Sequence, residues 1–521
     1  MKKNIYRNAA LLAVVTTLTA ASLTACGGSN SNTSSSSSPA VTKKEDPTPI
    51  SIMSVFFSVG PIGADNVILK EYEKRTNTKL NINWVSGNNY AEKVSVALAS
   101  GEMADMTLVL DTEGPNSSLM RGMVAQGAFW EIGKYYKDYP NLAKLPADIW
   151  NNIKMGDGKI YGLPRPRPLE GNNAGQVNIR KDWLDKLGLK VPETTDDLYE
   201  AMKQFTNNDP DGNGQKDTVG LVSNIGTNDL GGLRQIVNIF NASNYDWKVD
   251  SNGNLQHMYT EPGTKQALLW LRKAYAEGLI HKDIGVLKGT QVVEIEQSNK
   301  AGIGFDPLSQ AWTVDEVLRK TNPKAETLPL VALSGPNGKF IGRNTGVYGM
   351  FMIPKSVPEA KMKKILELYN YGLSDEGDEL GRYGLPDVHF TKNGDLYVTN
   401  DQAKTDALTT MSNIFSKFDK YQLAKQGNKI PADYVDRNKK ITDERSKVST
   451  SFPVSGVMSD TEMKIGADLG KKYVENFMKV MLGSAPIEAW DDYVAKLKAD
   501  PEYQKMIKEK NDSYKAVNGK K

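Results

Sequence analysis

Strand-like and helix-like segments alternate over residues 50–111, and this alternation restricts the fold more than any other feature. Runs of apolar and β-branched residues lie at 50–59, 80–85 and 106–110. The intervening residues 64–76 and 90–100 have the apolar spacing of helices. Short links between such elements favour a parallel sheet covered by helices. We therefore predict an α/β fold.

The expected ligand side of this sheet is the edge at which its strands end. Phe57 stands near the end of the first strand, Trp84 at the end of the second, and Asp111 directly after the third. In open parallel sheets, ligands bind beyond the carboxyl ends of the strands. These three residues are therefore candidates for a binding site.

Length and composition indicate a globular body with two lobes. The 521 residues are 39% hydrophobic and 24% charged, as in ordinary folded proteins, and such a length exceeds one ordinary core. The chain has 65 basic and 62 acidic residues, and three of the basic ones lie among the first seven positions. The remaining charge is balanced, which argues against nucleic acid as a partner.

The amino terminus has the features of an exported lipoprotein. Lys2, Lys3 and Arg7 precede a short apolar run at residues 9–21, which Thr and Ser interrupt too often for a transmembrane helix. The only cysteine, Cys26, follows a Leu-Thr-Ala sequence that resembles the lipobox of bacterial lipoproteins. The resemblance implies cleavage before Cys26 and acylation of its thiol and amino group. The alternative is a simple secretory signal with a chance cysteine.

The segment after the cysteine is expected to be a flexible tether. Residues 26–49 are mostly Gly, Ser, Asn and Thr, with charge and proline toward the end, a composition that cannot bury enough apolar surface to order itself. We therefore predict a signal peptide at residues 1–25, a tether at 26–49, and a monomeric body beyond. Two or more acyl chains such as palmitate would anchor it to the extracellular face of the cell membrane.

Five sequence motifs, in order along the chain, carry a family resemblance. They are Ala-Ser-Gly-Glu-Met-Ala-Asp at 99–105, Gly-Lys-Ile-Tyr-Gly-Leu-Pro at 158–164, Ile-Arg-Lys-Asp-Trp-Leu-Asp-Lys-Leu-Gly-Leu at 179–189, Lys-Ala-Gly-Ile-Gly-Phe at 300–305 and Tyr-Gly-Leu-Pro at 383–386. Together they resemble family 1 of the extracellular solute-binding proteins of ABC transporters. The resemblance is greatest to the calcium-containing branch that includes alginate oligosaccharide-binding proteins and lipoproteins of Gram-positive bacteria.

The resemblance implies a periplasmic-binding-protein-like fold of two α/β lobes, with a ligand cleft and a hinge. We place the first lobe at residues 50–168 plus 293–345, and the second at 169–292 plus 346–521. The implied function is capture of a carbohydrate, expected to be an oligosaccharide, for an ABC importer. Ligand contacts from both lobes would favour a closed state, which the transmembrane subunits of the permease recognise.

Residues 209–217 have the spacing of a calcium loop. Oxygen ligands at alternate positions wrap one hard cation, and Gly at the sixth position permits the sharp turn. The expected ligands are Asp209, Asp211, Asn213, the carbonyl of Gln215, and Asp217. Related sugar-binding proteins close the site with an acidic residue just after the last of these, where this chain has Thr218. We expect a structural Ca²⁺ whose removal lowers the melting temperature; the alternative is a metal-free surface turn.

Aromatic and polar side chains at strand ends and loops are the candidates for sugar contacts. A pyranose has an apolar face that stacks on an aromatic ring, and its hydroxyl groups need polar partners. The candidates are Phe57, Trp84, Asn89, Tyr90, Asp111, Trp247, Trp312 and Tyr348. For each aromatic candidate, packing in a core is the alternative interpretation.

Arg165 and Arg167 stand in a proline-rich extended segment. Their guanidinium groups could bind a carboxylate or sulfate of an acidic sugar through paired hydrogen bonds. The alternative is that they brace the hinge through ion pairs between the lobes. If they contact the ligand, uronate-containing oligosaccharides become the leading candidates.

Sequence patterns of catalysis are poorly represented. The three histidines, His257, His281 and His389, belong to no metal-binding motif, and the chain has no Gly-x-Ser-x-Gly or phosphate-loop signature. We therefore expect a binding protein rather than an enzyme. A binding protein for a non-sugar solute such as a peptide, and a polysaccharide-degrading lipoprotein, are the alternatives.

Overall fold

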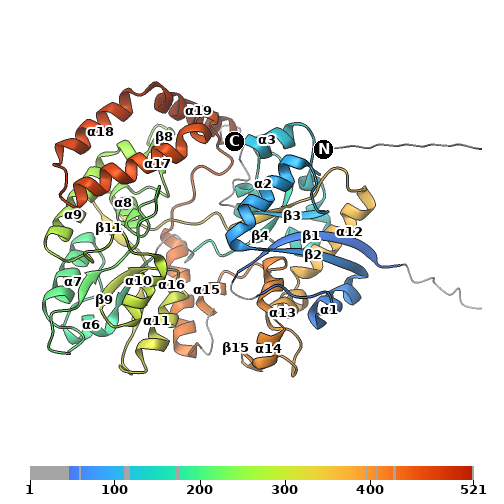
Figure 1. The fold of residues 1–521 in the computed structure, drawn as a ribbon, viewed down its shortest axis with the longest axis horizontal. Helices are drawn as coiled ribbons and strands as arrows, with labels where there is room; N and C mark the ends of the chain where they lie inside the picture. The colour runs from blue at the N-terminus through green and yellow to red at the C-terminus, as the bar shows by residue number, and fades with distance from the viewer. Residues whose placement is uncertain are drawn as a thin grey trace, which may run out of the picture. The chain divides into compact units, whose positions relative to one another are not determined.

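Two β-sheets, each with its own hydrophobic core, form the folded body (Figure 1). The computed structural model describes residues 46–57, 60–110, 118–155, 157–170, 176–394, 396–406, 408–425 and 430–518. They belong to one unit, Asp46–Lys521. The predicted signal peptide and Cys26 lie outside the described residues. The predicted tether runs two residues too far, because the first strand begins at Thr48.

The first sheet has five strands in the order β2-β1-β3-β13-β4. They are β1 (Thr48–Phe56), β2 (Thr78–Ser86), β3 (Met106–Leu110), β4 (Gly162–Pro166) and β13 (Val347–Met352). β1 is parallel to β2 and β3, whereas β13 is antiparallel to β3 and β4. Strands β1 to β4 therefore end at one edge of the sheet, and β13 begins there.

Helices cover both faces of this sheet. Because β1 lies between β2 and β3, the β1-α1-β2 and β2-α2-β3 connections run in opposite directions along the sheet. Right-handed crossovers then place α1 (Val67–Thr76) and α2 (Tyr90–Ser100) on opposite faces, as Figure 1 shows. On the face of α1 lie α12 (Glu359–Gly372) and α13 (Asp375–Tyr383), which both contact it. This arrangement confirms the predicted α/β alternation.

The second sheet has four strands in the order β10-β5-β9-β6. They are β5 (Val177–Arg180), β6 (Val219–Leu221), β9 (Ala301–Phe305) and β10 (Thr327–Pro329). β5 is antiparallel to β9 and β10, and β6 is parallel to β9. The helix α7 (Thr195–Asn207) begins with a capping box, in which Thr194 Oγ1 accepts from the backbone N–H of Asp197 and the Asp197 carboxylate accepts in return.

The remaining elements lie around these two cores. The helices are α3 (Ser118–Ala125), α4 (Pro140–Ala143), α5 (Ala147–Asn152), α6 (Lys181–Lys186), α8 (Leu233–Asn241), α9 (Pro262–Ala276), α10 (Gly289–Gln297), α11 (Gln310–Leu318), α14 (Asp401–Thr405), α15 (Gln422–Lys425), α16 (Ala432–Val448), α17 (Asp460–Met481), α18 (Glu488–Ala499) and α19 (Pro501–Asn518). Short 3₁₀ turns are η1 (Gly87–Asn89), η3 (Ile132–Lys134), η4 (Tyr136–Asp138), η5 (Met258–Thr260) and η6 (Leu408–Asn413). Three hairpins are β7 (Trp247–Val249) with β8 (Leu255–His257), β11 (Leu333–Gly335) with β12 (Gly338–Phe340), and β14 (Phe390–Asn393) with β15 (Leu396–Thr399).

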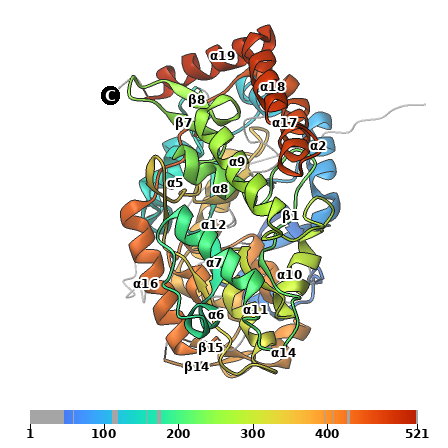
Figure 2. The ribbon, with the colours of Figure 1, turned by 90° about the vertical axis from the view of Figure 1, so that its left-hand side faces the viewer.

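The last three helices belong to the second core. Buried side chains of α17, α18 and α19 join those of α8 and α9 in that core, and α17 contacts α9 directly (Figure 2). Among the described residues, no helix is long and apolar enough to cross a bilayer.

The lobe boundaries differ from the prediction in the second half of the chain. The segment 293–345 was expected in the first lobe, but β9 and β10 lie in the second sheet. The segment after 346 was expected in the second lobe, but β13 lies in the first sheet, and the first core extends to Phe415. The reason is strand pairing, since β13 inserts between β3 and β4 far from its sequence neighbours.

Candidate functional site

Aromatic side chains gather at the edge where β1 ends and β13 begins. The ring centroids of Phe57 and Tyr348 lie 6.1 Å apart at an interplanar angle of 67°. Phe57 is 50% exposed. Its ring packs against Gly87, where a Cβ atom would lie 2.8 Å from Phe57 Cδ1. A glycine at position 87 therefore makes room for an aromatic ring that faces solvent.

Both predicted arginines lie over the Tyr348 ring. The Cζ atoms of Arg165 and Arg167 lie 4.5 Å and 3.9 Å from the ring centroid. Arg165 belongs to β4, and the backbone N–H of Arg167 donates to the carbonyl of Gly346 at 2.8 Å. The sheet pairing of β4 with β13 thus brings two guanidinium groups to one aromatic ring, an attractive arrangement through the π-electrons of the ring.

Arg165 is buried and is bonded inside the first lobe. Its Nη2 donates to the carbonyl of Ser412 at 3.0 Å and to Asn413 Oδ1 at 3.1 Å. These acceptors lie in η6, next to Met411 and Ile414 of the first core. Arg165 therefore joins β4 to η6 rather than forming the ion pair between lobes that was the alternative prediction.

The burial of Arg165 also leaves part of its charge uncompensated. Its Nη1 is buried and has no hydrogen-bond partner among the described residues. Burial, followed by the neighbouring charge of Arg167, lowers the pKa of Arg165 to about 9. An anion near this edge would stabilise the charged form.

Three predicted ligand residues are packed in interiors instead. Tyr90 is fully buried, and its hydroxyl donates to the carbonyl of Leu108 at 2.8 Å. Trp247 is 3% exposed in the second core. Trp312 is 8% exposed and packs against Tyr434 with ring centroids 5.1 Å apart. Because these rings are covered by protein, this arrangement contradicts their prediction as sugar-stacking residues.

The other three candidates have different outcomes. Trp84 lies half-buried on β2, and its Nε1 is buried with no hydrogen-bond partner among the described residues. Asn89 is exposed in η1, just after the end of β2. Asp111 lies outside the described residues. Trp84 packs partly against the first core but is not fully covered, and Asn89 is exposed, so both stay candidates.

A buried polar group in the second sheet was not predicted from the sequence. Glu296 of α10, Asn178 of β5 and Asp306 line a cavity of about 20 Å³, which is large enough for one water molecule. Glu296 Oε2 and Asn178 Oδ1 have no hydrogen-bond partner among the described residues. Burial, followed by the charge of Asp306, raises the pKa of Glu296 well above its ordinary value. Burial of two neighbouring carboxyl groups therefore favours the protonated form over a pair of negative charges.

A glycine is the sequence signal that could have revealed this group. A Cβ atom on Gly304 would lie 1.8 Å from Glu296 Oε1. The second glycine of the Gly-Ile-Gly motif in β9 thus accommodates the Glu296 side chain. The sequence does not reveal the contact between Glu296 and Gly304, because Glu296 has the spacing of an ordinary polar residue in an amphipathic helix.

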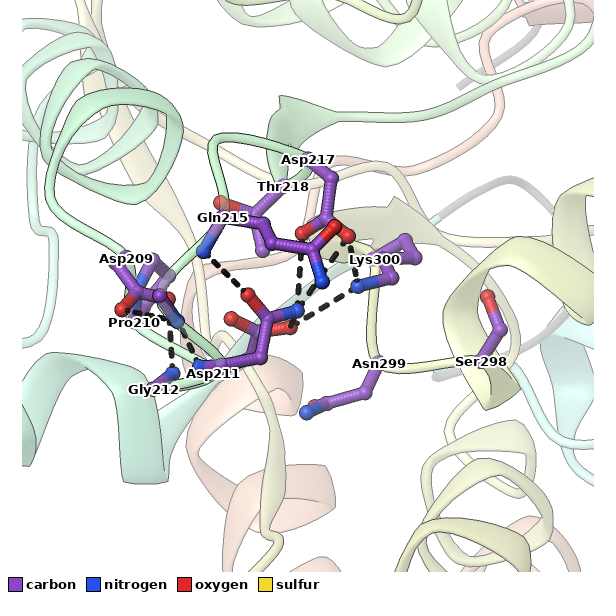
Figure 3. A network of polar contacts seen from close by, with 12 residues as sticks. Asp209, Pro210, Asp211, Gly212, Gln215, Asp217, Thr218, Ser298, Asn299 and Lys300 are labelled. Atoms are coloured by element: carbon purple, nitrogen blue, oxygen red, sulfur yellow. Dashed lines mark hydrogen bonds and ion pairs between the residues drawn. The ribbon is translucent and has the colours of Figure 1, made fainter.

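The predicted calcium loop connects α7 to β6 and is closed by its own hydrogen bonds (Figure 3). Asp209 Oδ1 accepts from the backbone N–H groups of Gly212 and Asn213, at 3.0 Å and 3.1 Å, and Oδ2 accepts from Gly214 at 3.0 Å. Gly212 and Gly214 have φ angles of 76° and 78°, which favour glycine. The backbone therefore has the sharp turn that the sequence predicts.

A lysine ammonium lies between two of the predicted metal ligands. Lys300 Nζ donates to Asp217 Oδ2 at 2.5 Å and to Asp211 Oδ2 at 3.2 Å (Figure 3). Asn213 turns its amide nitrogen to the same two carboxylates, at 2.9 Å from Asp211 Oδ2 and 3.2 Å from Asp217 Oδ1. Its amide oxygen accepts from the backbone N–H of Gln215 at 2.7 Å. The carboxylates of Asp211 and Asp217 thus accept hydrogen bonds from Lys300 and Asn213. Asn213, a third predicted ligand, directs its amide nitrogen rather than its amide oxygen toward these carboxylates.

The ligand set does not fit a calcium ion in this arrangement. No group of three or more His, Cys, Asp or Glu side chains could hold a metal ion within the described ranges. Thr218, at the position of the missing acidic ligand, donates its hydroxyl to the carbonyl of Phe205 at 2.8 Å and so faces the interior. Calcium takes six to eight oxygen ligands. A bound calcium ion therefore stays a prediction from the sequence.

Known proteins resemble this chain over most of its length. The family model of the bacterial extracellular solute-binding proteins matches residues 61–379. The polygalacturonan/rhamnogalacturonan-binding protein YtcQ of Bacillus subtilis is 32% identical over 454 residues, which cover 86% of this chain and 88% of YtcQ. Lipoprotein LipO of the same organism is 29% identical over 459 residues, covering 85% and 88%.

A solved structure shares the fold. The HMO-binding, ABC-transporter-associated solute-binding protein of Bifidobacterium longum infantis superposes with a TM-score of 0.71 at 20% identity, covering 92% of this chain and all of that one. This similarity confirms the predicted two-lobed α/β fold. The family model spans more than half of the chain, and YtcQ is more than 30% identical over most of both chains. The chain therefore belongs to the family of bacterial extracellular solute-binding proteins.

Proposed function

We propose that this protein captures an oligosaccharide that contains uronic acid units and delivers it unchanged to an ABC permease. The observation that carries the proposal is the pair of guanidinium groups over Tyr348, next to the half-exposed ring of Phe57. The relative YtcQ, which is named for binding polygalacturonan and rhamnogalacturonan, supports the acidic sugar.

The two kinds of side chain suit the two parts of a uronate. The apolar face of a pyranose packs on an aromatic ring, and Phe57 offers such a surface. The carboxylate of the same sugar accepts paired hydrogen bonds from a guanidinium group. Since Arg167 already rests on Tyr348, its side chain is held in place before the ligand arrives. A neutral sugar would gain the stacking and lose the charge-assisted hydrogen bonds.

Delivery to the permease requires a conformational change in the binding protein that the permease can recognise. Each lobe has a separate core, so the lobes can move as rigid bodies. A ligand that contacts both lobes binds the closed state more tightly and shifts the population toward it. The protein only binds and releases the sugar, which therefore leaves chemically unchanged.

We place this capture at the outer face of the membrane, with acylated Cys26 as the anchor. The lipobox-like sequence before Cys26 and the lipoprotein relative LipO support this location. Replacement of the thiol by Cys26→Ser removes the acylation site. We expect the variant to appear in the culture medium, whereas the unaltered chain stays in the membrane fraction. Equal membrane retention of both chains would refute the anchor.

Calorimetric titration tests the sugar class. A galacturonate oligosaccharide is compared with a galactose oligosaccharide of equal length, at low and high salt. A charge-assisted hydrogen bond contributes about 1.5–3 kcal/mol, so the acidic sugar should bind about 10- to 100-fold more tightly. Equal or tighter binding of the neutral sugar would reject the acidic class. Binding of an acidic peptide and of no glycan would reject the carbohydrate.

A further inference from the structure

We propose that the ammonium group of Lys300 is the built-in cation of the 209–217 loop, so that the loop closes without a calcium ion. The side chain bridges Asp211 and Asp217, two of the carboxylates that the sequence pattern assigns to calcium (Figure 3). The singly charged ammonium group of Lys300 thus occupies the position that a divalent calcium ion would take.

Strand pairing places Lys300 at the loop. Lys300 directly precedes β9, and its backbone carbonyl accepts from the N–H of Val219 at 2.9 Å. Val219 begins β6 only two residues after Asp217. The parallel pairing of β6 with β9 thus fixes the lysine backbone beside the end of the loop. The ammonium group reaches the carboxylates from a position that the fold itself determines.

The loop needs a positive charge because one of its carboxylates is buried. The side chain of Asp211 is 3% exposed, and an uncompensated buried carboxylate is costly. Lys300 and the Asn213 amide both contact Asp211 Oδ2, while Oδ1 has no partner among the described residues. The lysine therefore neutralises the buried charge.

Two further side chains of the loop region have hydrogen-bond partners within the protein. Asp209 accepts from the backbone N–H groups of Gly212, Asn213 and Gly214. Thr218 bonds to the carbonyl of Phe205, away from the loop. A calcium ion bound through Oδ2 of Asp211 and Oδ2 of Asp217 would have to displace Lys300, because two cations at contact distance from the same oxygen atoms repel each other strongly. Lysine and calcium are thus alternatives at this position.

Thermal unfolding of the mature chain with EDTA and with excess calcium chloride tests the proposal. We expect the same melting temperature in both conditions for the unaltered chain. Lys300→Met keeps the length of the side chain and removes its charge. We expect it to melt about 2–4 °C lower in EDTA and to regain that loss in calcium, because the emptied position can then accept the ion. Lys508→Met is the matched control, since it removes an exposed ion pair with Asp512.

Other results would overturn the proposal. They are a fall in the melting temperature of the unaltered chain on chelation, a Lys300→Met chain that behaves like the Lys508→Met control, and a destabilised Lys300→Met chain that calcium does not rescue. If Lys300→Met fails to fold, the calcium content of the unaltered chain after equilibrium dialysis decides. We expect no bound calcium, and one ion per chain would contradict the proposal.

Discussion

The guanidinium group of Arg167 stacks on Tyr348, with Cζ 3.9 Å from the ring centroid. We expect Arg167→Gln to weaken binding of a galacturonate oligosaccharide about 10- to 100-fold, because it removes a charge-assisted hydrogen bond. Binding of the neutral galactose oligosaccharide should change little. Calorimetric titration at two salt concentrations measures both, and the salt dependence for the acidic sugar should decrease in the variant.

Arg75→Gln is the control for this change. Arg75 lies on α1 of the same lobe, 28% exposed, and pairs with Glu71 and Glu376. It has the same charge and size as Arg167 but lies on a helix rather than at the strand edge. An equal loss of affinity in the two variants would show a general charge effect and would contradict a role of Arg167 at the site.

Phe57→Ala should weaken sugar binding with little effect on the free energy of unfolding. Phe57 is 50% exposed, so its truncation costs little folding energy but removes the stacking surface. Tyr90→Phe makes the opposite comparison, because it removes the buried bond to the Leu108 carbonyl and should lower stability by about 1 kcal/mol. Urea unfolding and calorimetric titration are measured on both. If Tyr90→Phe lost affinity for the sugar and Phe57→Ala kept it, Tyr90 rather than Phe57 would be the sugar-binding residue.

The Glu296–Asp306 pair should make the protein less stable as the pH rises. The folded pKa of Glu296 is raised above its unfolded value of about 4.5 by burial and by Asp306. Its contribution is therefore fully present below pH 4.5 and is lost as the pH rises through the folded pKa. Glu296→Gln should flatten the decrease in unfolding free energy above pH 4.5, whereas the exposed control Glu488→Gln should not. Parallel pH profiles for all three chains would contradict a raised pKa of Glu296 in the folded protein.

His257 should make the protein less stable as the pH falls. Burial, followed by the charge of Lys510, lowers its pKa to about 3, compared with about 6.5 in an unfolded chain. Its contribution to stability is present above pH 6.5 and is lost as the pH falls toward 3. We expect His257→Gln to lose less stability than the unaltered chain between pH 6.5 and 4. His281→Gln is the control, and its profile should follow the unaltered chain; a His257→Gln profile that also did so would disprove the prediction.

Local structure was predictable from the sequence because it depends on neighbouring residues. The strand predicted at residues 106–110 is β3, and the helix predicted at residues 90–100 is α2. Each of these features is set within a few residues.

Long-range pairing was not predictable in the same way. Nothing in the sequence of β13 shows that it pairs with β3 and β4, so the lobe boundaries were misplaced. Tyr90 and Trp247 have side chains suited to sugar stacking, but only the folded chain shows that they are buried. Lys300 reaches Asp217 across 83 residues, and the loop motif contains no sign of it.

We propose above all that this protein binds an acidic oligosaccharide and releases it intact. The most direct measurement is a calorimetric titration with a galacturonate oligosaccharide, followed by mass spectrometry of the recovered sugar. We predict saturable binding at one molecule per chain and a recovered mass equal to the starting mass. An absence of binding, a preference for the neutral sugar, or the appearance of shortened products would contradict the account.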